Sequence, residues 1–194
     1  MKSIIKNEFN EHNKVSMDTI DFVIDTIEDA AKICINSLKQ GGKILIIGNG
    51  GSAADAQHIA AELVGRYKNE RKGLSAIALT TDTSAITSIA NDFGYNNVFE
   101  RQVEALARSG DVLIGISTGG TSSNIISAIE LANNLGCNTI GFSGRDGGKF
   151  NEVCKVNIIV KSDTTARIQE MHILIGHIIC QIIDLEFSYV NKIE

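Results

Sequence analysis

The sequence contains neither proline nor tryptophan, and its four cysteines form no C-x-x-C pair. Without proline, glycine is the residue left to mark turns and helix ends. The cysteines are far apart and mostly lie in apolar surroundings, where a free cysteine packs as a small hydrophobic residue. We therefore interpret all four as reduced structural thiols: Cys34, Cys137, Cys154 and Cys180.

The sequence also lacks the marks of a secreted, membrane-bound or nucleic-acid-binding chain. The first ten residues are polar and charged, so we expect no signal peptide, and no apolar run approaches the length of a membrane span. A net charge of -5 gives no electrostatic reason to expect nucleic acid, and we interpret the short basic cluster from Lys68 to Lys72 as a solvated loop. We expect a cytoplasmic protein without a membrane or nucleic-acid partner.

The length and the apolar content suit one domain. With 194 residues, of which 43% are hydrophobic, the chain can bury a full core. We predict a single domain over residues 1–194, with an N-terminal helical segment (1–40) and an α/β core (41–194). The helical segment is predicted as a short helix over 2–13 and a long helix over 17–40 that ends at Gly41-Gly42. The long helix carries apolar residues on more than one face, which suggests a subunit partner.

Apolar runs alternate with helical segments through the rest of the chain. The predicted strands are 44–47, 74–79, 112–116, 138–142 and 156–160. The predicted helices are one from residue 53 on, 84–90, 98–107, one that opens in the 117–124 loop and ends near 135, and 164–190. Continuous apolar strands that alternate with helices predict an α/β fold, a three-layer sandwich with a central five-stranded parallel sheet.

A glycine-rich turn follows the first predicted strand. Gly48, Gly50 and Gly51 let the backbone turn sharply and approach a ligand, and Ser52 is expected to cap the helix that follows. The unpaired N–H groups of that helix N-terminus would face whatever lies in the turn.

His58 and Glu62 lie four residues apart on the same helix and therefore share a face. Such a pair can bind a divalent metal or act as an acid/base pair, but it is more often an exposed salt bridge. The last predicted helix favours the metal site, because Gln169 and His177 lie on one stripe of an otherwise apolar helix and need polar partners. If that stripe faces the glycine turn, the four residues form a site of nitrogen and oxygen ligands. We interpret His172 as a packing histidine or as one that supports a metal ligand without binding the metal itself.

The stretch from Ser117 to Asn124 concentrates hydroxyl groups and glycines between a strand and a helix N-terminus. Backbone N–H groups, hydroxyl donors and a positive helix end are what a phosphate requires, although an ordinary capping turn has the same composition. The pattern is neither a G-x-x-x-x-G-K-[ST] loop nor a G-x-G-x-x-G fingerprint, so the prediction is a phosphorylated small molecule and not a nucleotide. The turn-rich stretch 91–97 is expected at the same edge of the sheet.

Together these residues resemble the phosphoheptose isomerases of the sugar isomerase (SIS) domain family, over nearly the whole chain. The matching motifs are GNGGSAADAQH (48–58), AEL with GRY (61–63 and 65–67), ALTTDTS (78–84), ND (91–92), VFERQV (98–103), GIST (115–118) and TARIQE (165–170), which leads to His177.

The resemblance implies a SIS-domain homotetramer that uses its N-terminal helices in oligomerisation and builds its active sites from more than one subunit. It implies conversion of sedoheptulose 7-phosphate to D-glycero-D-manno-heptose 7-phosphate by enediol proton transfer, the first step of bacterial ADP/GDP-heptose biosynthesis for lipopolysaccharide, capsule or another surface glycan. It also implies one zinc ion per subunit, held by His58, Glu62, Gln169 and His177.

The remaining site residues are carried over from the matching motifs in the same way. Glu62 is the expected base and His177 its acid/base partner; because a carboxylate bound tightly to zinc is a poor base, Glu62 either changes its coordination during turnover or shares the task. The residues expected to contact the substrate are Asn49, Gly50, Gly51, Ser52, Glu62, Asn91, Asp92 and Gln169 at the sugar, with Ser117, Thr118, Gly119 and Ser122 at the phosphate.

One position departs from the family pattern. The phosphate loop of the family usually reads Ser-Thr-Ser-Gly, whereas here it reads Ser117-Thr118-Gly119-Gly120. We expect weaker phosphate binding and not a loss of function, unless the Gly119 N–H or a nearby hydroxyl of Thr121 or Ser123 compensates.

Two other classes compete with the isomerase. A related SIS-domain protein is a non-catalytic adaptor that binds the bacterial replication initiator, but an adaptor has no need of Glu62, Gln169 and His177. A domain that senses sugar phosphates would be expected to carry a DNA-binding or other output segment.

Overall fold

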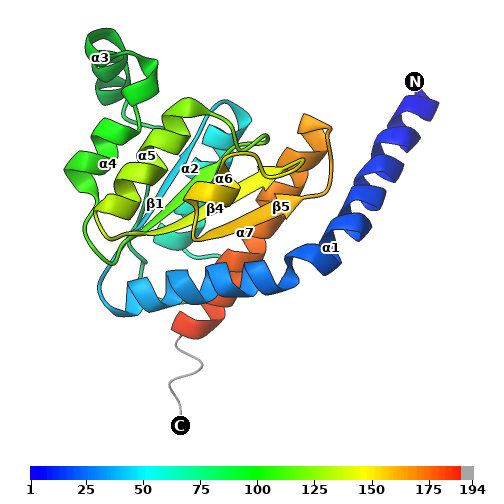
Figure 1. The fold of residues 1–194 in the computed structure, drawn as a ribbon. Helices are drawn as coiled ribbons and strands as arrows, with labels where there is room; N and C mark the ends of the chain where they lie inside the picture. The colour runs from blue at the N-terminus through cyan, green and yellow to red at the C-terminus, as the bar shows by residue number, and fades with distance from the viewer. Residues whose placement is uncertain (189–194) are drawn as a thin grey trace.

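The fold is built on a five-stranded sheet in which all strands are parallel. The computed structural model of the chain describes residues 1–188. In those residues the strands follow the order β2-β1-β3-β4-β5 (Figure 1). Their bounds are β1 Ile44–Gly48, β2 Ala76–Ala78, β3 Val112–Ile116, β4 Asn138–Gly144 and β5 Val156–Val160. The predicted α/β sandwich with a parallel five-stranded sheet is confirmed.

Helices cover both faces of the sheet. One face packs against α1 (Lys2–Lys39), α2 (Gly51–Val64) and α7 (Thr165–Phe187). The other packs against α4 (Glu100–Leu106), α5 (Ser123–Asn134) and α6 (Phe150–Val153). Because side chains alternate along a strand, Ile44 and Ile46 of β1 enter the first core while Leu45 and Ile47 enter the second. All five residues of β1 are buried, as in a doubly covered parallel sheet.

The strand order places the functional turns side by side. The chain leaves β1 toward β2 on one side and returns to β3 on the other, so the carboxyl ends of β1 and β3 flank the point where the strand order reverses. Open α/β sheets bind ligands at that point. The predicted glycine turn follows β1 and the predicted phosphate loop follows β3.

The N-terminal segment is one helix, not the two that were predicted. α1 runs from Lys2 to Lys39 without a break, and no residue before Val15 is buried. The first third of α1 runs along the outside of the fold beside the start of α7 (Figure 1), where Arg167 Nη1 donates to the Glu8 carbonyl oxygen at 2.8 Å and His12 Nδ1 lies 2.7 Å from Glu170 Oε2. It exposes several large apolar side chains: Ile4, Ile5, Phe9, Met17, Ile20, Phe22 and Ile24.

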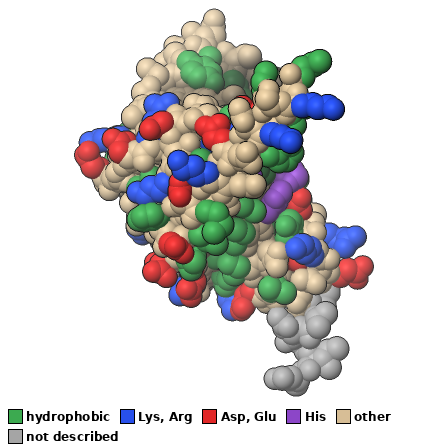
Figure 2. Space-filling view, turned by 90° about the vertical axis from the view of Figure 1, so that its right-hand side faces the viewer, with side chains coloured by type: hydrophobic (Ala, Val, Ile, Leu, Met, Phe, Trp, Pro, Cys, Tyr) green, Lys and Arg blue, Asp and Glu red, His purple; other side chains and the backbone are tan. Residues whose placement is uncertain are grey.

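An apolar groove runs between α1 and α7, with a volume of about 290 Å³. Side chains such as Ile20 and Ile24 of α1 and Leu174 and Ile178 of α7 line it. Figure 2 shows hydrophobic side chains gathered on this face of the molecule, with a histidine beside them. Exposed apolar patches on folded chains are typical of interaction surfaces and of ligand-binding grooves.

Several predicted boundaries shift. β2 is three residues long, within the expected 74–79 run. α3 (Thr83–Phe93) extends over Asn91 and Asp92, which were expected in a loop, and the 3-10 helix η1 (Tyr95–Asn97) follows it. α6 was not predicted, and the predicted end of the last helix at Val190 lies outside the described residues. None of the α3 residues is buried, and α3 stands clear of the sheet (Figure 1).

α7 is long and apolar enough, by length and composition alone, to cross a membrane, contrary to the expectation that no apolar run reaches that length. Half of its most apolar window is buried inside the fold. Residues such as Ile175, Ile179 and Ile183 pack in the core below the sheet, so α7 has the burial of a core helix. All four cysteines are free thiols, and burial raises the pKa of Cys34 to about 12, as expected of structural cysteines.

Candidate active site

The glycine turn connects β1 to α2. Gly50 has a φ of 56°, a conformation that favours glycine, and it is the N-cap of α2. α2 therefore begins at Gly51, and the expected cap, Ser52, lies buried in the first helical turn instead. The N-terminal N–H groups of α2 still face the turn, as the sequence predicted.

Asn49 is held in place by two side chains that the sequence analysis did not assign. Its Oδ1 accepts from Asn124 Nδ2 at 3.0 Å and from the Tyr95 hydroxyl at 3.1 Å, and its Nδ2 donates to Asn124 Oδ1 at 3.0 Å. Asn124 is buried at the start of α5. Because its carbonyl oxygen already has two donors, the Asn49 side chain can offer a sugar only its remaining N–H.

His58, Glu62 and His177 converge between α2 and α7. The Nε2 atoms of the two histidines are 2.9 Å apart, and Glu62 Oε1 lies 3.3 Å from His58 Nε2. One ligand atom from each of the three residues lies within 4.8 Å of the others. His58 is exposed, and Glu62 and His177 are half-buried, so a small molecule can reach the cluster.

This geometry suits a metal ion. Ligands about 2.0–2.2 Å from a tetrahedral zinc ion lie about 3.3–3.6 Å from one another, and two imidazoles with one carboxylate form a donor set that zinc accepts. The distances of 2.9 and 3.3 Å are close to that spacing. His58, Glu62 and His177 therefore present three ligand atoms of a kind and spacing that a zinc ion can use.

Gln169, the fourth predicted ligand, packs against the start of α2. A Cβ on Gly51 would lie 2.6 Å from Gln169 Nε2, so the amide rests on the glycine turn. Gln169 precedes His177 by eight residues, which is about two turns of α7. The structure thus places Gln169 against the predicted sugar-binding turn, about two helical turns from His177, and its role as a ligand stays a prediction.

We expect Gly51→Ala to raise KM for the sugar phosphate by about tenfold, because the new methyl group would displace the Gln169 amide and remove a hydrogen bond at the sugar. The measurement is steady-state kinetics of this variant beside Gln169→Ala and the double variant. If displacement of the amide is the cause, the double variant is no worse than Gln169→Ala alone. Additive losses would contradict this explanation.

The predicted phosphate loop lies at the carboxyl end of β3, ahead of α5. Ser117 Oγ and Ser122 Oγ are 3.0 Å apart, and Ser122 is the N-cap of α5. Gly120 has a φ of 61°, and a Cβ on it would lie 2.2 Å from the Gly147 carbonyl oxygen, so only glycine fits there. The loop therefore has the hydroxyl groups and the helix N-terminus that a phosphate requires.

Arg145 adds a positive charge that the sequence analysis did not assign. Its Nη1 lies 3.7 Å from the place of a Cβ on Gly119, and its own φ is 58°, a rare conformation for a residue other than glycine. The glycine-rich loop 143–148 was recognised from the sequence, but its contact with the phosphate loop was not.

We expect Gly119→Ser to lower KM by about three- to tenfold and to leave kcat within about twofold. A hydrogen bond to a charged group contributes about 1.5–3 kcal/mol, and part of that gain is lost because the new Cβ lies only 3.3 Å from Thr121 Oγ1. Gly119→Ala is the matched control, since it adds the Cβ without the hydroxyl. Equal KM values for the two variants would show that position 119 does not contact phosphate.

The other predicted residues differ in their burial. Asn91 and Asp92 are exposed at the end of α3, where the Asn91 amide donates to the Asp92 carboxylate at 2.8 Å. His172 is fully buried, and its Nε2 lies 3.0 Å from the Ser143 carbonyl oxygen. Burial lowers the pKa of His172 to about 4, so it is neutral at pH 7, in agreement with a packing role.

Three further residues near the cluster were missed or misassigned. The ring centroid of Tyr67 lies 5.6 Å from that of His177. Asp55, one turn before His58 on α2, has a half-buried carboxyl group whose pKa burial raises to about 6. Arg71 belongs to the basic cluster that was interpreted as a solvated loop, but its side chain is fully buried. That interpretation is wrong for Arg71, because a carboxylate in α7 pairs with it.

Comparison with known proteins assigns the class. Residues 9–144 match the SIS domain family, and the chain belongs to that family. Within it, the chain belongs to the phosphoheptose isomerases. It is 61% identical to the phosphoheptose isomerase of Aliarcobacter butzleri, over 97% of this chain and 100% of that protein. It is 54% identical to that of Campylobacter jejuni serotype O:6, over 96% of this chain and 100% of that protein.

Solved structures agree with this assignment. The phosphoheptose isomerase GmhA from Neisseria gonorrhoeae has a TM-score of 0.90 at 44% identity, covering 95% of this chain and 98% of that one. A phosphoheptose isomerase from Francisella tularensis has a TM-score of 0.91 at 38% identity, covering 94% of this chain and 97% of that one.

Proposed function

We propose that His58, Glu62 and His177 form the catalytic centre of a sedoheptulose 7-phosphate isomerase. The observation that carries the proposal is the convergence of their three ligand atoms within 4.8 Å, in a chain that belongs to the phosphoheptose isomerases. As an enzyme of this class the chain moves the carbonyl group of the heptose from C2 to C1, and the product is D-glycero-D-manno-heptose 7-phosphate.

Two side chains carry the proton transfer. Isomerisation removes a proton from the carbon beside the carbonyl group, passes through an enediol, and returns a proton to the neighbouring carbon. Glu62 is the base that takes the proton, and His177 is the acid/base partner at the enediol oxygens. His58 Nε2 lies 2.9 Å from His177 Nε2 and 3.3 Å from Glu62 Oε1, so His58 keeps the base and its partner close to each other.

A zinc ion fits between these residues. His58, Glu62 and His177 would hold it, with Gln169 as the fourth ligand, one ion in each subunit. When bound, zinc acts as a Lewis acid that stabilises negative charge on the carbonyl and enediol oxygens.

The remaining predicted contacts orient the sugar phosphate. The loop from Ser117 to Ser122 binds the phosphate at the N-terminus of α5, with Thr118 and Gly119 between them. The turn from Asn49 to Ser52 lines the sugar, and its Gly50 and Gly51 allow the backbone to approach closely. Asn91 and Asp92 complete this set from the end of α3.

The chain assembles as a homotetramer, and it acts as a single SIS domain over residues 1–194 in the cytoplasm. The exposed apolar side chains on α1 and the apolar groove between α1 and α7 support assembly through the N-terminal helix. The substrate is a small sugar phosphate, with no nucleic-acid or membrane partner. The reaction is the first step toward ADP- or GDP-heptose for lipopolysaccharide, capsule or another surface glycan.

Conversion of sedoheptulose 7-phosphate by the purified full chain tests the function. Loss of the ketose and appearance of the anomeric proton of the aldose are followed by NMR, with zinc-loaded, metal-stripped and zinc-restored protein. We expect turnover that is lost on stripping and regained with zinc. Turnover that survives stripping would contradict the metal site and not the isomerase.

The adaptor is the alternative, and the quoted relatives and structures do not support it, because each of them is named as an isomerase. No turnover in any of the three preparations, with folded protein, would favour it. Binding to the bacterial replication initiator would then be measured with the same protein.

A further inference from the structure

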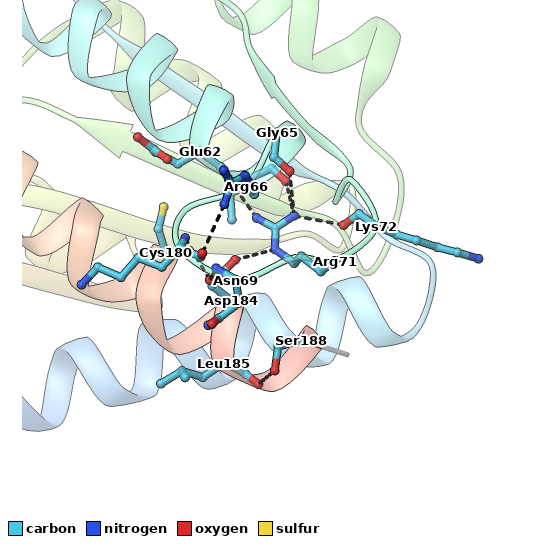
Figure 3. Close-up of polar contacts among 12 residues, drawn as sticks. Glu62, Gly65, Arg66, Asn69, Arg71, Lys72, Cys180, Asp184, Leu185 and Ser188 are labelled. Atoms are coloured by element: carbon cyan, nitrogen blue, oxygen red, sulfur yellow. Dashed lines mark hydrogen bonds and ion pairs between the residues drawn. The ribbon is translucent and has the colours of Figure 1, made fainter. Parts of the chain in front are cut away.

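A buried ion pair joins the loop after α2 to the last turns of α7 (Figure 3). Arg71 Nε donates to Asp184 Oδ1 at 2.9 Å, and both side chains are 0% exposed. Removing two charges from water costs free energy that their attraction repays only if further hydrogen bonds satisfy the remaining atoms. Here those bonds connect the pair to the end of α2 and to the loop after it, next to the candidate active site.

Arg71 caps the helix that carries His58 and Glu62. Its Nη2 donates to the Glu62 carbonyl oxygen at 2.8 Å, and its Nη1 donates to the Leu63 carbonyl oxygen at 2.9 Å. The last carbonyl groups of a helix have no partner within the helix, and α2 has no basic residue of its own in its last turn. Arg71 supplies a donor to the Glu62 carbonyl group and a second donor, beside the Leu74 N–H, to the Leu63 carbonyl group, and thereby fixes the end of α2.

Asp184 holds the loop itself. Its Oδ2 accepts from the backbone N–H groups of Lys68 at 3.1 Å and Asn69 at 2.6 Å. Burial by itself would raise the pKa of Asp184, but these N–H groups and Arg71 outweigh it and hold the pKa below its usual value. The carboxylate therefore stays ionised, and the residue just before Lys68 is Tyr67, whose ring lies on His177.

The pair thus connects the three segments that meet at the site. Asp184 follows His177 by seven residues, about two turns on one face of α7. Glu62 lies on α2, Tyr67 on the loop and His177 on α7, and the hydrogen bonds of Arg71 and Asp184 reach all three segments.

We propose that Arg71 and Asp184 are positioning residues of the isomerase, which set Glu62 against His177 and keep the Tyr67 ring on the His177 imidazole. The inference rests on the proposed roles of Glu62 and His177. A displacement of about 1 Å at reacting groups can lower a rate about a hundredfold, so a residue outside the site can control turnover through placement alone.

The experiment compares Asp184→Asn with a matched control, Asp111→Asn. Asp111 is also a buried carboxylate with two backbone donors, Lys43 N at 2.9 Å and Arg108 N at 2.8 Å, and with one cation, Lys43 Nζ. Asp111 directly precedes β3, so it lies at the amino-terminal ends of the strands, whereas the glycine turn and the phosphate loop lie at the carboxyl ends. Both variants lose the same kind of buried charge, but only Asp184 connects to the site.

Kinetics are measured on zinc-loaded protein well below the unfolding midpoint of the less stable variant. We expect Asp184→Asn to lower kcat by about ten- to hundredfold, with KM within about threefold because the phosphate loop is untouched. Asp111→Asn is expected to keep kcat within about twofold at a similar loss of thermal stability. Equal kcat values for the two variants at matched stability would overturn the proposal.

A spectroscopic measurement separates this inference from the proposed function. The chain has four histidines, so the imidazole Cε1–H resonance of His177 can be assigned by comparison with His177→Asn. We expect that resonance to move in Asp184→Asn, as the Tyr67 ring leaves, and to stay in place in Asp111→Asn. This result does not depend on turnover. A wild-type protein without isomerase activity would contradict the proposed function, but the position of the His177 resonance would still test whether Asp184 places the Tyr67 ring.

If Asp184→Asn does not fold, Tyr67→Leu decides the question. It removes the ring from His177 and leaves the ion pair unchanged. We expect kcat to fall at least about fivefold and the His177 resonance to move, as in the first variant. A wild-type kcat in Tyr67→Leu would overturn the proposal.

Discussion

Glu62→Gln is expected to lower kcat for heptose isomerisation by at least about a thousandfold. A positioned general base contributes about 10²–10⁴ in rate, and the amide that replaces it cannot accept the proton. The change is isosteric at a half-buried side chain, so the fold is expected to persist. Steady-state kinetics and circular dichroism of the same preparation check both parts of the expectation.

Zinc content distinguishes the two ways in which this variant can fail. Glu62 lies 3.3 Å from His58 and belongs to the candidate metal site, so its loss can reduce metal binding as well as remove the base. Kinetics at saturating zinc, with the bound metal quantified, isolate the loss of the base. Glu70→Gln, an exposed carboxylate in the following loop, is the control and is expected to behave as wild type. More than a tenth of the wild-type kcat in zinc-loaded Glu62→Gln would assign the base to another residue.

The sequence predicts the sheet well because its physical signal is local. Five apolar runs separated by helical segments leave little choice but a parallel sheet covered on both faces. The two functional turns follow from the same pattern, since the carboxyl ends of neighbouring parallel strands meet at one edge. The error in α1 was avoidable, because residues 1–40 contain neither glycine nor proline and so nothing that breaks a helix.

Other differences arise where tertiary structure overrides local preference. Asn91 and Asp92 favour turns, yet α3 includes them and ends at Gly94, whose φ of 83° is the natural stop. Ser52 is a good N-cap by type, but Gly50 has the backbone conformation that the turn requires and takes that place.

The site was predictable only in part, because pairs distant in the sequence leave no periodic signal. The spacing of His58 and Glu62 placed both on one helical face, but their meeting with His177 depended on how α2 packs on α7, which the family resemblance supplied. Tyr95 and Asn49 are 46 residues apart, and Arg71 and Asp184 are 113 apart. Charge alone suggested that Arg71 is solvated, and only the structure identifies its partner.

Arg71→Met is expected to lower the free energy of unfolding by about 3–5 kcal/mol, because it leaves the buried Asp184 carboxylate without its cation. Methionine keeps much of the volume of the side chain, so the loss reports charge and hydrogen bonding more than packing. Urea unfolding of wild type and variant at one fixed protein concentration measures the difference, since assembly of subunits would make the midpoint depend on concentration.

The double variant Arg71→Met/Asp184→Leu tests how much of the stability comes from the hydrogen bonds that the ion pair makes with the backbone. Replacing an isolated buried pair by apolar residues is often neutral or stabilising. Here Arg71 also donates to the backbone carbonyl group of Glu62, and Asp184 accepts from two backbone N–H groups, so the double variant would remove the partners of these three part-buried groups. The Leu63 carbonyl group, which Arg71 also contacts, keeps the Leu74 N–H as a donor. Each such group costs about 1–3 kcal/mol, and we expect the double variant to stay at least about 2 kcal/mol less stable than wild type. Recovery to wild-type stability would mean that the backbone bonds contribute little, and the pair would then act on the loop through charge alone.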